Sequence, residues 1–144
     1  MVVHAEIYLN GLGDEMPVFT IEIGATPPLF LAAAKCRVPS IRRRALELMS
    51  KAPRKECMHG SQSTAEFARR LVGIEEAGLG LPLPVPHGGS SLPIVDDNVL
   101  PSESQRIRGP ELLKNLTTGQ YEIKVEKYSE EGRYFRIANT YDPM

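Results

Sequence analysis

The residues of this chain that could support catalysis or metal binding are few and widely spaced. Cys57 and His59 place a thiol and an imidazole two positions apart. A catalytic thiol needs a base and an orienting group close to it, and a zinc site needs about four ligands at regular spacing. Neither pattern surrounds this pair, since the other two histidines, His4 and His87, lie in unrelated contexts. We therefore expect no metal and no cofactor.

Other candidate catalytic motifs are also weak. Asp96 and Asp97 are adjacent in a proline-rich segment, where acidic residues usually form turns. The glycine-rich segments 11–13 and 78–80 lack the strand–helix context and the Lys-Ser/Thr ending of a phosphate-binding loop. Cys36 is interpreted as a small core residue. The sequence therefore predicts that the chain is not an enzyme.

A basic cluster is the clearest charge feature. Residues 35–55 contain eight basic residues and one acidic residue, although the whole chain has a net charge of −1. Such a cluster can contact nucleic acid, but it is also typical of a solvated helix face beside acidic neighbours. No aromatic or amide side chains are interleaved with Arg42, Arg43 and Arg44, so sequence-specific DNA binding is not expected. Helical spacing places Arg43 on the solvent side.

Helical spacing also predicts a buried ion pair. In a predicted helix at residues 39–51, Arg42 lies within the apolar arc, and in a predicted helix at residues 61–77, Glu75 does. An unpaired buried charge costs several kcal/mol. We therefore predict that an Arg42–Glu75 ion pair bridges the two helices, with Glu76 as the alternative partner.

Local patterns predict the other elements of the N-terminal part. Alternating side chains indicate a strand at residues 18–23. Thr26 is then a suitable N-cap for a helix at residues 27–37, which begins with two prolines and is apolar on almost all sides, as a buried helix is. Gly78 suits the left-handed position that follows the helix at residues 61–77.

The C-terminal part predicts an antiparallel hairpin. Alternation over residues 121–128 and 133–141 places a three-residue loop between two strands, with Gly132 left-handed. The predicted register pairs Val125 with Ile137, Glu126 with Arg136, and Tyr128 with Tyr134.

A two-stranded hairpin is marginally stable alone, and the remaining chain suggests what supports it. We expect it to pack on the helices or to pair with a strand at residues 3–9 or 18–23. Leu112 and Leu113 are predicted to form a short helical turn.

Together these elements predict an α+β fold. The expected domain is a small three-helix unit packed with short N-terminal strands and the C-terminal hairpin. Residues 1–144 are predicted to form one domain, which comprises a strand–helix part (1–78), a Pro/Gly-rich linker (79–105) and a hairpin part (106–144). No apolar run is long enough to cross a membrane, so an intracellular protein is expected.

Three segments resemble one protein family. FTIEIGATPPLFLAAAKCR, PSIRRRALELM followed by PRKE, and FARRLVGIEEAG are similar to the end of the regulatory region of fungal binuclear zinc-cluster (six-cysteine) transcription factors. The match covers about residues 19–78, with a weaker match through LPSESQRIR and EIKVEK. In that family the region follows a cluster that binds two zinc ions and DNA, and it carries no known catalytic residues. This chain has two cysteines, so no DNA-reading residues are carried over.

The resemblance implies a non-catalytic regulatory or interaction domain. Such a domain would be nuclear and would lack the zinc-cluster DNA-binding domain, as a fragment or a degenerate relative does. It would act by contact with a protein partner or by self-association, because exposed apolar surface favours both. One alternative is a standalone intracellular module that binds a small molecule or peptide through residues 78–101. A more remote alternative is a small enzyme that depends on Cys57 or His59.

Overall fold

A computed structural model describes most of the chain, namely residues 1–11, 19–21, 24–51, 55–56, 59–82, 94–128 and 134–141. Only the backbone is described at residues 55, 59, 128 and 134–141. The fold is α+β, which confirms the predicted class. Its elements in chain order are α1 (Val2–Gly11), β1 (Phe19–Thr20), α2 (Thr26–Lys35), α3 (Pro39–Lys51), β2 (Lys55–Glu56), β3 (His59–Gly60), α4 (Ser61–Glu75), the 3-10 helix η1 (Glu103–Gln105), β4 (Glu111–Lys114), β5 (Tyr121–Tyr128) and β6 (Tyr134–Tyr141).

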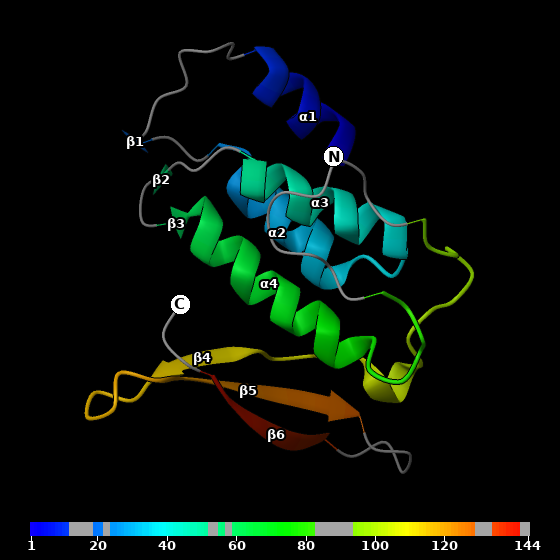
Figure 1. The fold of residues 1–144 in the computed structure, drawn as a ribbon, viewed down its shortest axis with the longest axis vertical. Coiled ribbons are helices and arrows are strands. Elements are labelled where there is room, and N and C mark those ends of the chain that lie inside the picture. The colour runs from blue at the N-terminus through cyan, green and yellow to red at the C-terminus, as the bar shows by residue number, and fades with distance from the viewer. Residues whose placement is uncertain are drawn as a thin grey trace.

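The helices and the larger sheet form two layers. Helices α2, α3 and α4 pack against one another, with α1 on the outer side of α2 and α3, and an antiparallel sheet in the order β4-β5-β6 lies beyond α4 (Figure 1). A small second sheet in the order β1-β2-β3 lies at one end of the helical layer.

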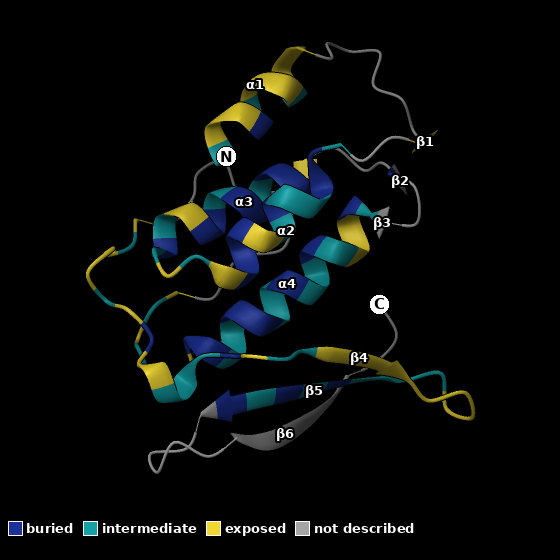
Figure 2. Cartoon of the chain, turned by 180° about the vertical axis from the view of Figure 1, so that it is seen from behind, coloured by how far each residue is buried: buried dark blue, intermediate teal, exposed yellow. Residues whose placement is uncertain are grey.

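Two apolar clusters hold these layers together. One lies among the four helices and includes Leu29, Leu46 and Met49. The other joins α2 and α4 to the sheet, and it consists of Ala34, Leu71, Ile107, Ile123 and Val125. In Figure 2 buried residues are seen on α4 and along β5, two of the elements that this second cluster joins.

The predicted helix at residues 39–51 coincides with α3, whereas the other two predicted helices run two residues past the ends of α2 and α4. Gly78 has φ +84°, the left-handed conformation expected of it. Helix α2 is less buried than its composition predicts, because Leu31 is 53% exposed.

The N-cap of α2 differs from the prediction. Thr26 is already helical, and the cap position is Ala25, which makes no side-chain capping bond. Instead, the Glu56 carboxylate from β2 accepts hydrogen bonds from the backbone N–H groups of Gly24 (3.1 Å), Ala25 (3.1 Å) and Thr26 (2.9 Å). A distant carboxylate therefore does what the local threonine was expected to do.

Two predicted elements are wrong. Residues 3–9 form helix α1 instead of a strand, because Val2, Ala5 and Leu9 contact the helical core at helical spacing. Leu112 and Leu113 lie in strand β4 instead of a helical turn, and they pair with Ile123 and Glu122 of β5. Strand β4 therefore pairs with β5 at an edge of the hairpin, where a strand at residues 3–9 or 18–23 was expected.

The hairpin register is confirmed. Val125 pairs with Ile137, Glu126 with Arg136, and Tyr128 with Tyr134. Gly132 lies outside the described residues. Of the predicted strand at residues 18–23, Phe19 and Thr20 form β1, which pairs with β2 in parallel.

Candidate functional site

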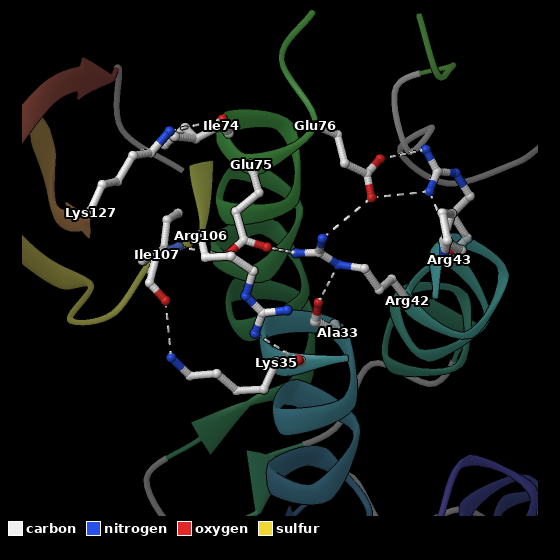
Figure 3. A network of polar contacts seen from close by, with 11 residues as sticks. Ala33, Lys35, Arg42, Arg43, Ile74, Glu75, Glu76, Arg106, Ile107 and Lys127 are labelled. Atoms are coloured by element: carbon white, nitrogen blue, oxygen red, sulfur yellow. Dashed lines mark hydrogen bonds and ion pairs between the residues drawn. The ribbon is translucent and has the colours of Figure 1, made fainter. Parts of the chain in front are cut away.

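A buried charge network joins the helices to one another (Figure 3). Nη2 of Arg42 lies 2.6 Å from Oε2 of Glu75, at the place where the sequence predicts an ion pair between α3 and α4. Both side chains are buried, with 0% and 1% exposed. Nε of Arg42 also donates to the carbonyl oxygen of Ala33 in α2 at 2.8 Å. Arg42 therefore contacts three helices, since it lies on α3 and bonds to α2 and α4.

The same network reaches the sheet layer. The second oxygen of Glu75 accepts a 2.7 Å hydrogen bond from the backbone N–H of Ile107, and Nζ of Lys35 donates to the carbonyl of Ile107 at 3.3 Å. From β5, Nζ of Lys127 donates to the carbonyl of Ile74 at 3.3 Å. Burial lowers the pKa of Lys127, although the charge of Glu75 opposes this shift. These bonds fix the sheet relative to α2 and α4.

Arg43 does not face solvent, so that prediction is wrong. Its side chain is 2% exposed, and Nη2 lies 2.7 Å from Oε2 of Glu76. The same nitrogen donates to the carbonyl of Pro82 at 2.8 Å. Helical spacing predicts exposure from α3 considered by itself. In the structure, the chain that follows α4 passes over this face of α3 and buries Arg43.

Arg44 also has carboxylate partners, namely Glu6 of α1 and Glu47 of α3. Each of the three consecutive arginines is therefore ion-paired, and two of them are buried, so these side chains make packing contacts between elements.

An apolar pocket lies between the helices and the sheet. Its volume is about 650 Å³, and it is bounded by the N-terminal halves of α2 and α4 and by β4 and β5. Phe30 and Phe67 stack in its wall, with ring centroids 5.9 Å apart and an interplanar angle of 11°. The lining consists of Thr26, Pro27, Phe30, Leu31, Gly60, Ser63, Thr64, Phe67, Leu112 and Tyr121.

The chemistry of this lining is hydrophobic with hydroxyl groups at intervals. Among the described residues, none that lines the pocket is charged. A cation lies beside one of the lining residues, because Nζ of Lys114 in β4 is 5.6 Å from the ring centroid of Tyr121. This distance suits a cation–π contact. The arrangement can therefore accept an apolar group and can contact an anion beside it.

The other predicted candidates do not converge on this pocket. Cys57 and His87 lie outside the described residues, as does the side chain of His59, while His4 is exposed on α1 and Cys36 is a half-buried free thiol. Within the described part of the chain, no group of three His, Cys, Asp or Glu side chains could hold a metal ion.

Asp96 and Asp97 have separate structural uses. The Asp96 carboxylate accepts a 2.9 Å bond from the N–H of Asn98, as in an Asx turn, and Asp97 accepts bonds from the N–H (2.9 Å) and hydroxyl (2.7 Å) of Ser40 at the start of α3. None of the described residues of the loop at 78–101, which was offered as a ligand site, lines the pocket.

The sequence contains no signal that would have revealed the pocket. Phe67 and Leu112 lie far apart in the sequence, and only the packing of β4 beside α2 and α4 brings them together.

Comparison with known proteins does not identify the chain. No protein-family model matches it, and neither a curated protein nor a solved structure matches it. Within the described residues, no helix is long and apolar enough to cross a membrane.

Proposed function

We propose that this chain is a non-catalytic interaction domain that acts in transcription regulation by contacting another protein. The observation that carries the proposal is the apolar pocket between α2, α4 and the β4–β5 edge. The resemblance of residues 19–78 to the regulatory region of fungal zinc-cluster factors supports the regulatory and nuclear role.

The pocket has properties of a binding site for an apolar anchor. Its volume of about 650 Å³ falls within the range of roughly 300–1,000 Å³ that is usual for ligand pockets. Large apolar side chains that enter such pockets contribute most of the free energy of protein association. The stacked rings of Phe30 and Phe67 offer a flat aromatic surface to such a side chain.

The walls of the pocket are rigidly connected. Arg42, Glu75 and Ile107 link α2, α3, α4 and the segment that leads into β4. A pocket whose walls are already in place costs less conformational entropy when a partner binds. The absence of charged groups from the described lining supports binding over acid–base catalysis.

A standalone binding module for a small molecule is the second candidate, and the volume of the pocket favours it. A thermal shift with a small apolar ligand that is lost in Thr64→Arg would support it. The protein-contact proposal instead requires a macromolecular partner.

The test uses transcription as the readout. The chain is fused to a DNA-binding module of known specificity, and expression of a reporter gene is measured in fungal cells. We expect Leu31→Asp, which places a charge in the pocket wall, to reduce the response at least about tenfold, as loss of a central interface residue does. Ile41→Asp is the matched control, because Ile41 is also exposed but lies on α3 away from the pocket.

Two results would contradict the proposal. One is a fusion that leaves reporter expression unchanged, and the other is an equal effect of the two substitutions. A photo-crosslinking residue at position 64 should also capture a defined protein, whereas one at exposed Gln62 should not.

A further inference from the structure

We propose that β4 is a receptor edge for an extended segment of the partner protein. The segment adds to the sheet as a fourth strand and places a bulky apolar side chain in the pocket. This inference rests on the proposed function, because it names the surface and the partner chemistry through which the domain acts.

The position of β4 in the sheet supports strand addition. In the order β4-β5-β6, β5 pairs with one side of β4, and among the described residues no strand pairs with the other side. All four side chains of β4 are exposed, including Leu112 and Leu113. The outer side of an edge strand presents backbone N–H and C=O groups that can pair with another chain.

The pocket lies on the face of β4 that an added strand would share. Leu112 and Lys114 pair with Ile123 and Tyr121, respectively. Ile123 belongs to the buried cluster, while Leu112 and Tyr121 line the pocket, so this is the face toward the helices. Because side chains alternate along a strand, every second residue of an added strand would point toward α2 and α4. This combination of an open edge and a pocket for alternate side chains is a known mode of peptide recognition.

Charge specifies the partner further. Lys114 is exposed and lies over the Tyr121 ring, and no carboxylate of the described residues is within ion-pair distance of its Nζ. The positions of an added strand opposite Leu112 and Lys114 are two residues apart and share a face. The partner segment should therefore carry a bulky apolar residue and, two positions away, an aspartate or glutamate.

A second copy of the chain fits this edge poorly. Two β4 strands that pair about a two-fold axis at Leu112 place Pro110 opposite Lys114, and an axis at Leu113 places Leu112 there. Neither register supplies a carboxylate. Symmetric β4–β4 pairing therefore lacks the charge complement of Lys114, and we assign this edge to a strand of a different protein.

The test is a selection with the full 144-residue chain. The immobilised chain is exposed to a displayed library of random ten-residue peptides. We expect enriched peptides to share a bulky apolar residue two positions from an acidic residue. Lys114→Glu should change the preferred acidic residue to Lys or Arg. Lys124→Glu, on the opposite face of the sheet, is the matched control and should leave the preference unchanged.

A second measurement tests the main-chain pairing. In an enriched peptide, N-methylation of the alternate amides that face β4 should weaken binding at least about tenfold. This is the effect of losing roughly one hydrogen bond between neutral groups. Methylation of the intervening amides should not. Chemical shift changes on binding should centre on residues 112–114 and the pocket.

Several outcomes would overturn the inference. They are enriched peptides without this spacing, enriched peptides with helical spacing, an unchanged preference in Lys114→Glu, and self-association of the chain that protects the β4 amides. If Leu31→Asp abolishes the reporter response while no strand-forming peptide is enriched, the proposed function survives and this inference fails. If such peptides bind while reporter expression never responds, the proposed function fails.

Discussion

At the scale of single residues, buried charges decide what a substitution does to this protein. The Arg42 guanidinium and the Glu75 carboxylate are both shielded from water and lie 2.6 Å apart. If one partner is removed, the other charged group is left without an opposite charge and without water around it. Removing one member of this pair therefore costs far more stability than breaking a surface ion pair.

The Arg42–Glu75 pair can be tested with a double-mutant cycle. We expect Arg42→Met to lower the free energy of unfolding by about 3–5 kcal/mol, since Glu75 is then buried and unpaired. Glu75→Gln should lower the free energy of unfolding much less in the Arg42→Met background than in the parent. The difference is a coupling energy of about 2 kcal/mol or more. Urea denaturation measures all four variants. The half-exposed Arg44–Glu6 pair is the control and should couple by less than about 1 kcal/mol. Additive effects at Arg42 and Glu75 would refute the prediction.

Glu47 should contribute to the acid dependence of stability. Partial burial raises its pKa, but hydrogen bonds from Lys51 and Arg44 outweigh this effect and hold the pKa below its ordinary value of 4.5. A carboxylate with a lowered pKa stabilises the fold above its unfolded pKa, and this stabilisation is lost as the pH falls through the folded pKa. We expect Glu47→Gln to cost less than about 1 kcal/mol at pH 7.

The difference in the free energy of unfolding between Glu47→Gln and the parent should begin to shrink as the pH falls below 4.5, and it should vanish once the pH is below the lowered pKa of the folded state. Urea denaturation at a series of pH values measures it. Glu122→Gln is the control, because Nζ of its neighbour Lys124 is 4.0 Å away. If the difference in the free energy of unfolding between Glu47→Gln and the parent persists in acid, the charge of the Glu47 carboxylate is not the cause of that difference.

At the scale of elements, the start of α2 depends on a residue from elsewhere in the chain. Glu56 accepts three backbone hydrogen bonds there and is 1% exposed. Because hydrogen bonds to a charged group contribute about 1.5–3 kcal/mol each, we expect Glu56→Ala to lower the free energy of unfolding by at least about 2 kcal/mol in urea.

Thr26→Ala is the comparison for this cap. Its hydroxyl is not the cap, so the hydroxyl should matter less than the carboxylate. A larger loss in Thr26→Ala than in Glu56→Ala would show that the local residue caps the helix after all.

The elements also show how far the sequence could lead. Strong periodicity was sufficient for α3 and for the hairpin register, since both depend on neighbours close in sequence. The expectation of a strand at residues 3–9 failed, because packing of α1 on the helical core decides the structure there. The Arg42 and Glu75 positions follow from one-helix geometry, whereas the burial of Arg43 depends on Pro82, which no periodicity reports.

At the scale of the whole molecule, the helical layer and the sheet should unfold together. They share the cluster around Leu71 and Ile123 and the bond from Ile107 to Glu75. Four of the five tyrosines lie in β5 and β6, and the chain has no tryptophan. Tyrosine fluorescence therefore reports mainly on the sheet and far-ultraviolet circular dichroism mainly on the helices. We expect the two urea midpoints to coincide. Separate midpoints would mean that the layers are independent units.

The contacts of Pro82 and Asp97 have a consequence for how this protein can change. The Pro82 carbonyl bonds to Arg43, and the Asp97 carboxylate bonds to Ser40, so both positions are attached near the first turn of α3. Both ends of the stretch that joins them are therefore attached to α3. Its length should then have little effect on the free energy of unfolding, since each doubling of loop length costs only about 0.6 kcal/mol of loop-closure entropy. We therefore expect that a label can be inserted between these two anchors with little effect on the pocket, since no described residue of this segment lines it.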